Sequence, residues 1–220
     1  MTGEVQTPWI DFSLYLITDR SQTCGRTLVE VIGDALRGGV RAVQLREKDM
    51  TSRAYYELAY ELRKLTARYN ARLFINDRID ITLAVDADGV HLGEESIPIH
   101  RARKILGERK LIGVSCHNQV SAITAQAKGA DFITFGPVYH TLSKAPYGQP
   151  LGVGKLEEVS RILQIPVFAL GGINRDNTHE VIAAGAFGVA LVSAVIAADN
   201  PREETQKLLS LIPSHDDHQD

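Results

Sequence analysis

A run of alternating charge follows an apolar stretch near the start of the chain. The segment VQLREKD, residues 43–49, carries Gln44, Arg46 and Lys48 at every second position, which places them on one face of an extended strand. Guanidinium and ammonium groups bind phosphate oxygens well. Together with Lys144, which follows a later apolar run, they predict a site for a diphosphate. Solvated surface charge is the alternative, but both faces of a parallel strand are normally covered, and a buried polar group needs a partner.

Acidic residues follow two further apolar runs. Asn76 and Asp77 end RLFIND, and Glu94 and Glu95 follow GVHLG. Proteins usually hold Mg²⁺ with one or two carboxylates, phosphate oxygens of the substrate and waters. We therefore expect a Mg²⁺ site with Asp77 as a ligand and a glutamate as a candidate second acid, although Asp77 also suits a helix N-cap. His91 alternates with apolar neighbours, which favours a place in a packed layer over metal binding.

Two successive motifs near the C-terminus indicate a second anion site. In ALGGIN, residues 169–174, the glycine pair Gly171 and Gly172 follows an apolar run and lets backbone N–H groups approach an anion. In ALVSA, Val192 and Ser193 precede an expected helix, and helix N-termini attract phosphate. The alternative is a tight turn followed by an N-cap serine. Both motifs in this order favour a phosphate site.

The longest connection without an expected helix or strand is GPVYHTLSKAPYGQPLG, residues 136–152. Loops of this length in compact domains are often functional. Thr141, Ser143 and Lys144 supply hydrogen-bond donors for an anionic ligand. An inert surface loop is the alternative.

The elements that carry these residues alternate in type. Eight short apolar runs are separated by helix-like patterns, for example over residues 52–69 and 119–128. This order predicts a parallel sheet, and eight units suit a closed (β/α)8 barrel, with a doubly wound open sheet as the alternative. The polar candidates cluster where the runs end, and in a barrel these ends converge on one face. No composition shift marks a second domain, so we expect one domain over 1–220 with a frayed polar tail over about 213–220.

The bulk composition narrows the range of partners. The chain has 220 residues, 44% hydrophobic and 23% charged, and a formal net charge of -3. That charge gives no general attraction to nucleic acid or to an anionic membrane. Cys24 and Cys116 lack metal-type spacing, and the first residues do not read as a signal peptide. We expect a cytoplasmic protein that binds small phosphorylated molecules, and the oligomeric state, a homo-oligomer included, is left open.

The motifs together resemble thiamine phosphate synthase and its relative, the TenI-type thiazole tautomerase. The resemblance spans nearly the whole chain and rests on YLITD, QLREK, NDR, DGVHLG, GVSCH, GPVYHTLSK, ALGGI and ALVSA, in the family's order and spacing. It implies a phosphate-binding (β/α)8 barrel. It also implies a synthase that joins hydroxymethylpyrimidine diphosphate to thiazole phosphate with Mg²⁺ and releases pyrophosphate.

The resemblance assigns roles to residues of this chain. It implies that Lys48, Arg46 and Lys144 assist catalysis, Lys48 by neutralising charge on the departing pyrophosphate, and that Asp77 binds Mg²⁺. The residues that would hold the pyrimidine diphosphate are Gln44, Arg46, Lys48, Asn76, Ser115 and Lys144. Those that would hold the thiazole phosphate are Thr141, Ser143, Gly172, Val192 and Ser193.

One segment departs from the family pattern. Synthases usually have a second metal-binding aspartate in an HLGQDD-like run, whereas this chain has HLGEES, with Ser96 at that position. Glu95 or a water would then replace the aspartate. The departure keeps two alternatives open, a tautomerase and a non-catalytic regulator that binds thiazole phosphate. The histidine that tautomerases can use for proton transfer is Pro137 here, and His117 and His140 are the nearby candidates.

Overall fold

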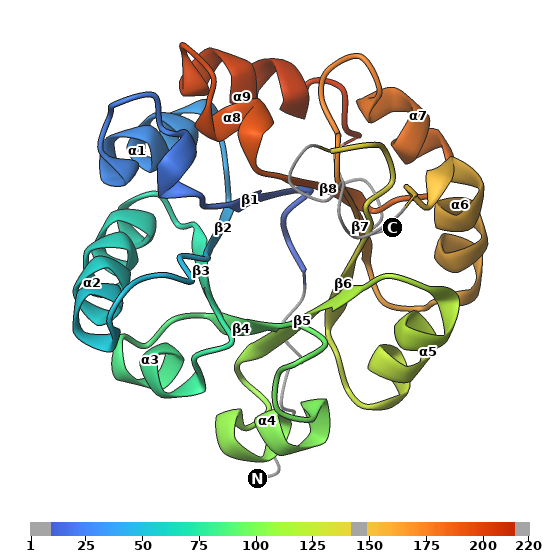
Figure 1. The fold of residues 1–220 in the computed structure, drawn as a ribbon, viewed down its shortest axis with the longest axis horizontal. Helices are drawn as coiled ribbons and strands as arrows, with labels where there is room; N and C mark the ends of the chain where they lie inside the picture. Colours follow the sequence, from blue (N-terminus) through green and yellow to red (C-terminus); the bar gives the residue numbers. More distant parts are fainter. Residues whose placement is uncertain (1–9, 142–148, 214–220) are drawn as a thin grey trace, which may run out of the picture.

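Eight parallel strands form a closed barrel in which each strand pairs with the next along the chain and β8 pairs with β1 (Figure 1). The computed structural model describes residues 10–141 and 149–213. The expected (β/α)8 barrel is confirmed, and the open-sheet alternative is wrong. The strands are β1 (Leu14–Ile17), β2 (Ala42–Leu45), β3 (Arg72–Asn76), β4 (Gly89–Leu92), β5 (Leu111–Cys116), β6 (Phe132–Phe135), β7 (Val167–Leu170) and β8 (Gly188–Leu191).

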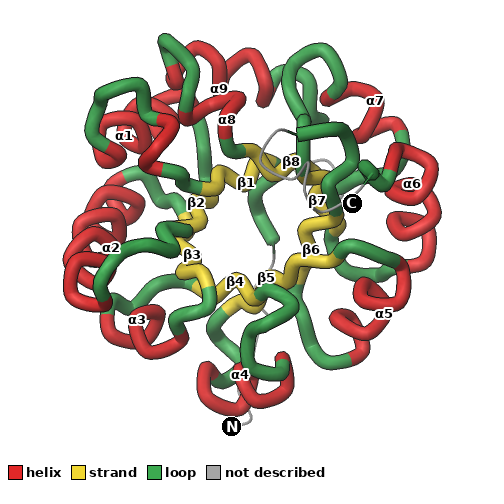
Figure 2. The backbone as a smooth tube through the Cα atoms, viewed as in Figure 1, coloured by secondary structure: helices red, strands yellow, loops and turns green. Residues whose placement is uncertain are grey.

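Helices surround the barrel as an outer ring (Figure 2). The helix expected over 52–69 is α2 (Ser52–Arg68), and that expected over 119–128 is α5 (Gln119–Ala127). No helix in the part of the chain that the structure describes is long and apolar enough to cross a bilayer. The remaining helices are η1 (Arg20–Gln22), α1 (Leu28–Gly38), α3 (Ile79–Ala84), α4 (Ile99–Leu106), α6 (Gly152–Ile162), α7 (Thr178–Ala183), α8 (Ser193–Ile196) and α9 (Pro201–Leu209).

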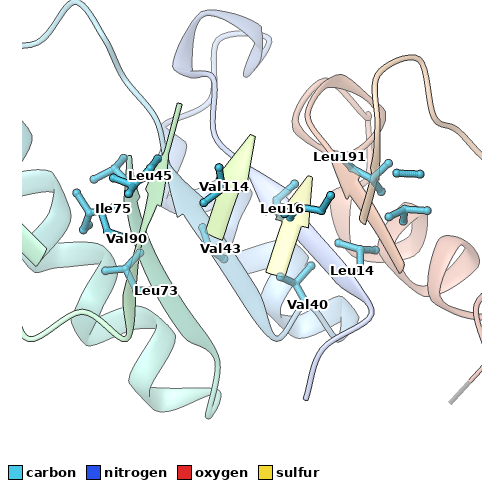
Figure 3. Packing of buried hydrophobic residues seen from close by; sticks show 14 of the residues in the cluster. Leu14, Leu16, Val40, Val43, Leu45, Leu73, Ile75, Val90, Val114 and Leu191 are labelled. Atoms are coloured by element: carbon cyan, nitrogen blue, oxygen red, sulfur yellow. The ribbon is translucent and has the colours of Figure 1, made fainter. Parts of the chain in front are cut away.

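Alternation along the strands divides the interior into two cores. Val43 and Leu45 point outward and pack with helix residues in the larger core, part of which Figure 3 shows. The alternate residues of each strand, such as Gln44 in β2, point into the barrel. Five aromatic rings fill the barrel below its carboxyl end, with neighbouring ring centroids 5.2 to 6.1 Å apart. These rings belong to Phe12, Tyr15, Phe74, Phe132 and Phe168.

The β2 strand ends earlier than the charge alternation suggests. Gln44 is its last inward residue, and the strand stops at Leu45. The Thr18 hydroxyl then accepts a hydrogen bond from the Arg46 N–H at 2.9 Å, so the backbone leaves the sheet ladder at this point. The prediction that Gln44, Arg46 and Lys48 share one face of a strand is therefore wrong, because Arg46 and Lys48 lie on the following loop.

Candidate active site

The carboxyl end of the barrel has a polar side and an apolar side. Above the aromatic rings, the inward residues of β2 to β6 are all polar, whereas those of β7, β8 and β1 are apolar. This arrangement suits a ligand that is polar on one side only. The polar set is Gln44, Asn76, His91, Ser115 and Thr134, and the apolar set is Leu170, Val192 and Ile17.

Two side-chain amides connect β2 to the loop after β3. Gln44 Nε2 lies 3.0 Å from Asn76 Oδ1, and Asn76 Nδ2 lies 2.7 Å from Asp77 Oδ2. Because a carboxylate only accepts, Asn76 must donate its NH₂ to Asp77 and accept at its carbonyl. Gln44 must then donate its NH₂ to Asn76, which leaves its own carbonyl oxygen as an acceptor. That oxygen, Gln44 Oε1, is buried and has no hydrogen-bond partner among the described residues.

The Asp77 carboxylate lies at the mouth of the barrel, in contact with the residue that replaces the family's second aspartate. Ser96 donates its hydroxyl hydrogen bond to Asp77 Oδ1 and accepts one from the Gly93 N–H at 2.7 Å. Asp77 has a φ of 61° and is anchored by its N–H to the His91 carbonyl at 3.0 Å. The helix-cap alternative for Asp77 is wrong, because Arg78 holds the N-cap position of α3 without a side-chain hydrogen bond.

These donors fit Mg²⁺ only in part. Glu94 and Glu95 are exposed, and among the residues the structure describes neither has a hydrogen bond to the Asp77 side chain. No group of three or more His, Cys, Asp or Glu in that part of the chain could hold a metal ion. One carboxylate and one hydroxyl are sufficient for Mg²⁺ where substrate phosphates and waters complete the octahedron. The site therefore fits a metal ion that binds together with a phosphorylated ligand.

His91 is a neutral structural residue at the centre of the polar side. Burial lowers its pKa to about 3; the nearby Asp77 charge opposes this shift, and the Arg46 charge adds to it. Its Nε2 lies 3.0 Å from Ser115 Oγ, and its Nδ1 lies 3.3 Å from the Tyr15 hydroxyl. The predicted packed position is confirmed. His91 thereby fixes the Ser115 hydroxyl at the mouth.

The loop after β2 carries two cations without ion-pair partners. Within residues 10–141 and 149–213, no salt bridge involves Arg46 or Lys48. The positive charge of Arg46 contributes to the lowered pKa of His91 inside the barrel, which is consistent with a guanidinium close to the mouth. Both residues line a cavity of about 440 Å³ together with Asp19, Arg20, Ser21, Glu47 and Asp49. The lining contains three carboxylates and three cations, so it can attract an anion only where Arg46 and Lys48 face the ligand and the carboxylates are bound elsewhere.

The glycine pair after β7 is required by packing as well as by backbone conformation. Gly171 and Gly172 have φ values of 99° and 69°, which disfavour other residues. A Cβ on Gly171 would lie 2.6 Å from Pro137, and one on Gly172 would lie 2.8 Å from the Cβ of Tyr139. Asn177 Nδ2 holds the Gly172 carbonyl at 2.9 Å. The β6 loop therefore lies directly against this turn.

The helix α8 begins at Ser193, beside the glycine turn along the barrel. Val192 is its N-cap and makes no side-chain cap bond, so the alternative of an N-cap Ser193 is wrong. The first N–H groups of such a helix have no intrahelical partner and can bind an anion. Thr141 is the last described residue before residue 149, and the predicted ligands Ser143 and Lys144 lie outside the described residues.

The two candidate histidines differ in their surroundings. His117 Nδ1 contacts the Gly136 carbonyl oxygen, which holds the imidazole against the β6 loop. Because a carbonyl oxygen only accepts, Nδ1 is the donor in this contact. His140 is exposed on the same loop.

Sequence reasoning missed four residues that shape the mouth. Arg20 pairs with Glu47 and Asp49, and Asn177 fixes the glycine turn. For Arg20, Glu47 and Asp49, the only signal in the sequence is the alternation of acids with cations in REKD. That alternation indicates that the acids need partners of their own, but it does not identify Arg20 as the partner.

Comparison with known proteins identifies the family. The model of the thiamine monophosphate synthase family matches residues 14–195. The chain is 59% identical to a protein of Geobacter sulfurreducens over 204 residues, 93% of this chain and 96% of that one. It is 44% identical to the thiamine-phosphate synthase of Clostridium novyi over 202 residues, 92% of this chain and 99% of that one.

A solved structure agrees with the sequence relatives. The thiamine phosphate pyrophosphorylase of Pyrococcus furiosus superposes with a TM-score of 0.84 at 39% identity, over 91% of this chain and 95% of that one. A 3-hexulose-6-phosphate synthase, at 18% identity and a TM-score of 0.71 over 91% of this chain and all of that one, shares the fold alone. The matched model, the close relatives and the barrel architecture together show that this chain belongs to the thiamine monophosphate synthase family.

Proposed function

We propose that this protein joins hydroxymethylpyrimidine diphosphate to thiazole phosphate and releases thiamine phosphate and pyrophosphate. Membership of the family and relatives that are named for this activity support the reaction. Under this proposal, the enzyme acts in the cytoplasm on small phosphorylated substrates. The observation that carries it is the free acceptor on Gln44.

The Gln44 carbonyl oxygen distinguishes the synthase from its alternatives. Among the residues the structure describes, this buried oxygen has no donor, and a buried polar atom without a partner is costly. An aminopyrimidine carries N–H donors, whereas a thiazole phosphate has none. A pyrimidine ring that donates to Gln44 would satisfy the oxygen at the depth where the barrel is polar. In a tautomerase or a thiazole phosphate regulator, a water would have to supply this donor.

The diphosphate would lie above the pyrimidine, against the cations of the β2 loop. We assign Arg46, Lys48 and Ser115 to its oxygens, and Lys144, which lies outside the described residues, stays a predicted ligand. Asp77 and Ser96 would hold Mg²⁺, with phosphate oxygens and waters completing its coordination. Bound there, Mg²⁺ supplies charge neutralisation for the diphosphate. Glu95, exposed on the loop between β4 and α4, would contribute to this site directly or through a water.

The thiazole phosphate would occupy the apolar side of the mouth. Its phosphate would bind the backbone of Gly172, Val192 and Ser193, with Thr141 and Ser143 as additional donors from the β6 loop. The apolar layer formed by Ile17, Leu170 and Val192 then lies below the thiazole ring. This arrangement places the two rings side by side, which is the geometry that bond formation needs.

The chemical step needs no protein nucleophile. The bond between the pyrimidine methylene carbon and the diphosphate oxygen breaks, and its electron pair leaves with pyrophosphate. The thiazole nitrogen then gives its lone pair to the cationic carbon. Lys48 and Arg46 stabilise the negative charge that grows on the leaving group, and they are already in place before the reaction. His91 stays neutral and holds Ser115 in position.

A tautomerase is the second candidate, favoured by Ser96 in place of an aspartate and by the position of His117 against the β6 loop. Purified protein, both substrates and Mg²⁺ would be assayed for pyrophosphate and thiamine phosphate. We expect catalytic turnover that EDTA abolishes. Folded protein that forms no thiamine phosphate, but isomerises the thiazole phosphate carboxylate, would refute the synthase in favour of the tautomerase.

A further inference from the structure

Arg20 binds both acids of the REKD segment, which could otherwise neutralise the segment's own cations. Residues 46–49 alternate two cations with two acids, so the carboxylates could pair with their own neighbours and cancel the charge meant for a ligand. The structure directs both acids elsewhere. Glu47 Oε2 lies 3.3 Å from Arg20 Nη1, and the Asp49 carboxylate receives a bidentate pair of 2.6 Å bonds from Arg20 Nη1 and Nη2.

Glu47 is locked in this arrangement by further donors. Its side chain is only 4% exposed, and Oε1 accepts from the Thr18 hydroxyl at 2.7 Å and from the Arg20 N–H at 3.1 Å. The same Thr18 hydroxyl accepts from the Arg46 N–H. These bonds fix the Glu47 side chain and the backbone at Arg46, directly before it. Asp49 is different, because its side chain is 74% exposed and only Arg20 holds it among the described residues.

We propose that Arg20 is a positioning residue that binds the acids of the REKD segment and so keeps Arg46 and Lys48 available for the diphosphate. The inference rests on the proposed function, which requires a diphosphate at this mouth. It concerns a residue on η1, outside the ligand set that the resemblance implies. Loss of Arg20 would release Asp49, which can then pair with Lys48 in competition with the ligand.

Arg20 lines the same cavity, so direct binding of the anion by Arg20 is the competing explanation. The geometry argues against it. Both terminal nitrogens of the guanidinium are already bonded to carboxylates, and one cation shared by two carboxylates is a net negative group. Such a group repels an anion, whereas Arg46 and Lys48 attract one.

A double-mutant cycle separates the two explanations. Calorimetric titration with inorganic pyrophosphate and Mg²⁺ would compare wild type, Arg20→Ala, Asp49→Asn and the double variant. We expect Arg20→Ala to weaken binding about threefold to fivefold, because the freed Asp49 carboxylate competes with the ligand for the exposed Lys48, and exposed ion pairs are weak. Asp49→Asn alone should change affinity less than about twofold, and in the Arg20→Ala background it should restore most of the loss. Arg53→Ala, which breaks an exposed Arg53–Glu57 pair on α2, controls for the loss of one surface charge.

Steady-state kinetics supply a readout that general structural damage would not give. Arg20→Ala should raise KM for the diphosphate and leave KM for the thiazole phosphate unchanged. Arg20→Lys, which keeps the charge but loses the bidentate geometry, should be intermediate and covers the case in which the alanine variant does not fold. A double variant as weak as Arg20→Ala would overturn the inference and make Arg20 a direct ligand. Wild-type protein that binds no pyrophosphate with Mg²⁺ would instead overturn the proposed function on which the inference rests.

Discussion

The free acceptor on Gln44 leads to a prediction in which activity and stability change in opposite directions. Gln44→Leu preserves the approximate size of the side chain and removes both the buried oxygen and the donor to Asn76. An unsatisfied buried polar atom costs about 1–3 kcal/mol, and a satisfied neutral hydrogen bond contributes about 1 kcal/mol. Folding should therefore lose about 1 kcal/mol from the Asn76 bond and regain about 1–3 kcal/mol from the removed oxygen.

Substrate binding should suffer in the same variant. In this variant the pyrimidine N–H no longer has the Gln44 oxygen as its acceptor. The loss of about 1–3 kcal/mol of binding energy should lower kcat/KM for the diphosphate roughly 5-fold to 150-fold. The free energy of unfolding, measured in urea, should be unchanged or up to about 2 kcal/mol higher. This combination is typical of a site residue that function keeps at the expense of stability.

Thr205→Val supplies the matched control. The Thr205 hydroxyl, on α9 outside the barrel, is also buried without a hydrogen-bond partner in the part of the chain that the structure describes. Its removal should raise stability by about 1 kcal/mol and leave kcat/KM unchanged. A Gln44→Leu protein that is clearly less stable, yet as active as wild type, would refute the reasoning.

Three further predictions concern the histidine, the metal site and the two phosphate sites. His91 has a folded pKa of about 3 against about 6.5 when unfolded, so its contribution is complete above pH 6.5 and decreases as the pH falls. Urea unfolding should show about 2 kcal/mol less stability at pH 5 than at pH 7, and His91→Gln should lack this loss, whereas the exposed His100→Gln should retain it. Ser96→Asp should lower the Mg²⁺ concentration for half-maximal activity about tenfold because it adds a carboxylate beside Asp77, and an unchanged Mg²⁺ titration would argue against this metal position. Lys48→Ala should lower kcat about 100-fold and also raise KM for the diphosphate, whereas Ser193→Ala should mainly raise KM for thiazole phosphate; equal effects on both substrates in kinetic assays would contradict the assignment.

The barrel and the convergence of its strand ends could be predicted because they depend on local patterns. Each strand is an apolar run bounded by glycine or polar residues, and eight such runs with helices between them leave few topologies. The grouping of Gln44, Asn76 and Asp77 followed from the same argument, because the carboxyl ends of parallel strands meet at one face.

The details that failed depend on contacts between distant residues. The end of β2 is set by Thr18, 28 residues before Arg46, and the sequence gives no sign that a hydroxyl there takes the Arg46 N–H. The position of Asp77 outside the helix cap follows from its positive φ and from the bond to the His91 carbonyl. Arg20 is one of many arginines, and only the folded chain shows which acids it binds.

The aromatic layer below the mouth has a consequence for the order of events. Five rings pack across the barrel beneath Gln44 and His91, so the site is a pocket with a floor rather than a tunnel. A molecule held at the depth of Gln44 is covered by whatever then binds at the level of the glycine turn and α8. Under the proposed reaction, the pyrimidine enters first and the thiazole closes the entrance behind it. The floor therefore favours an ordered reaction, in which the pyrimidine diphosphate binds before the thiazole phosphate.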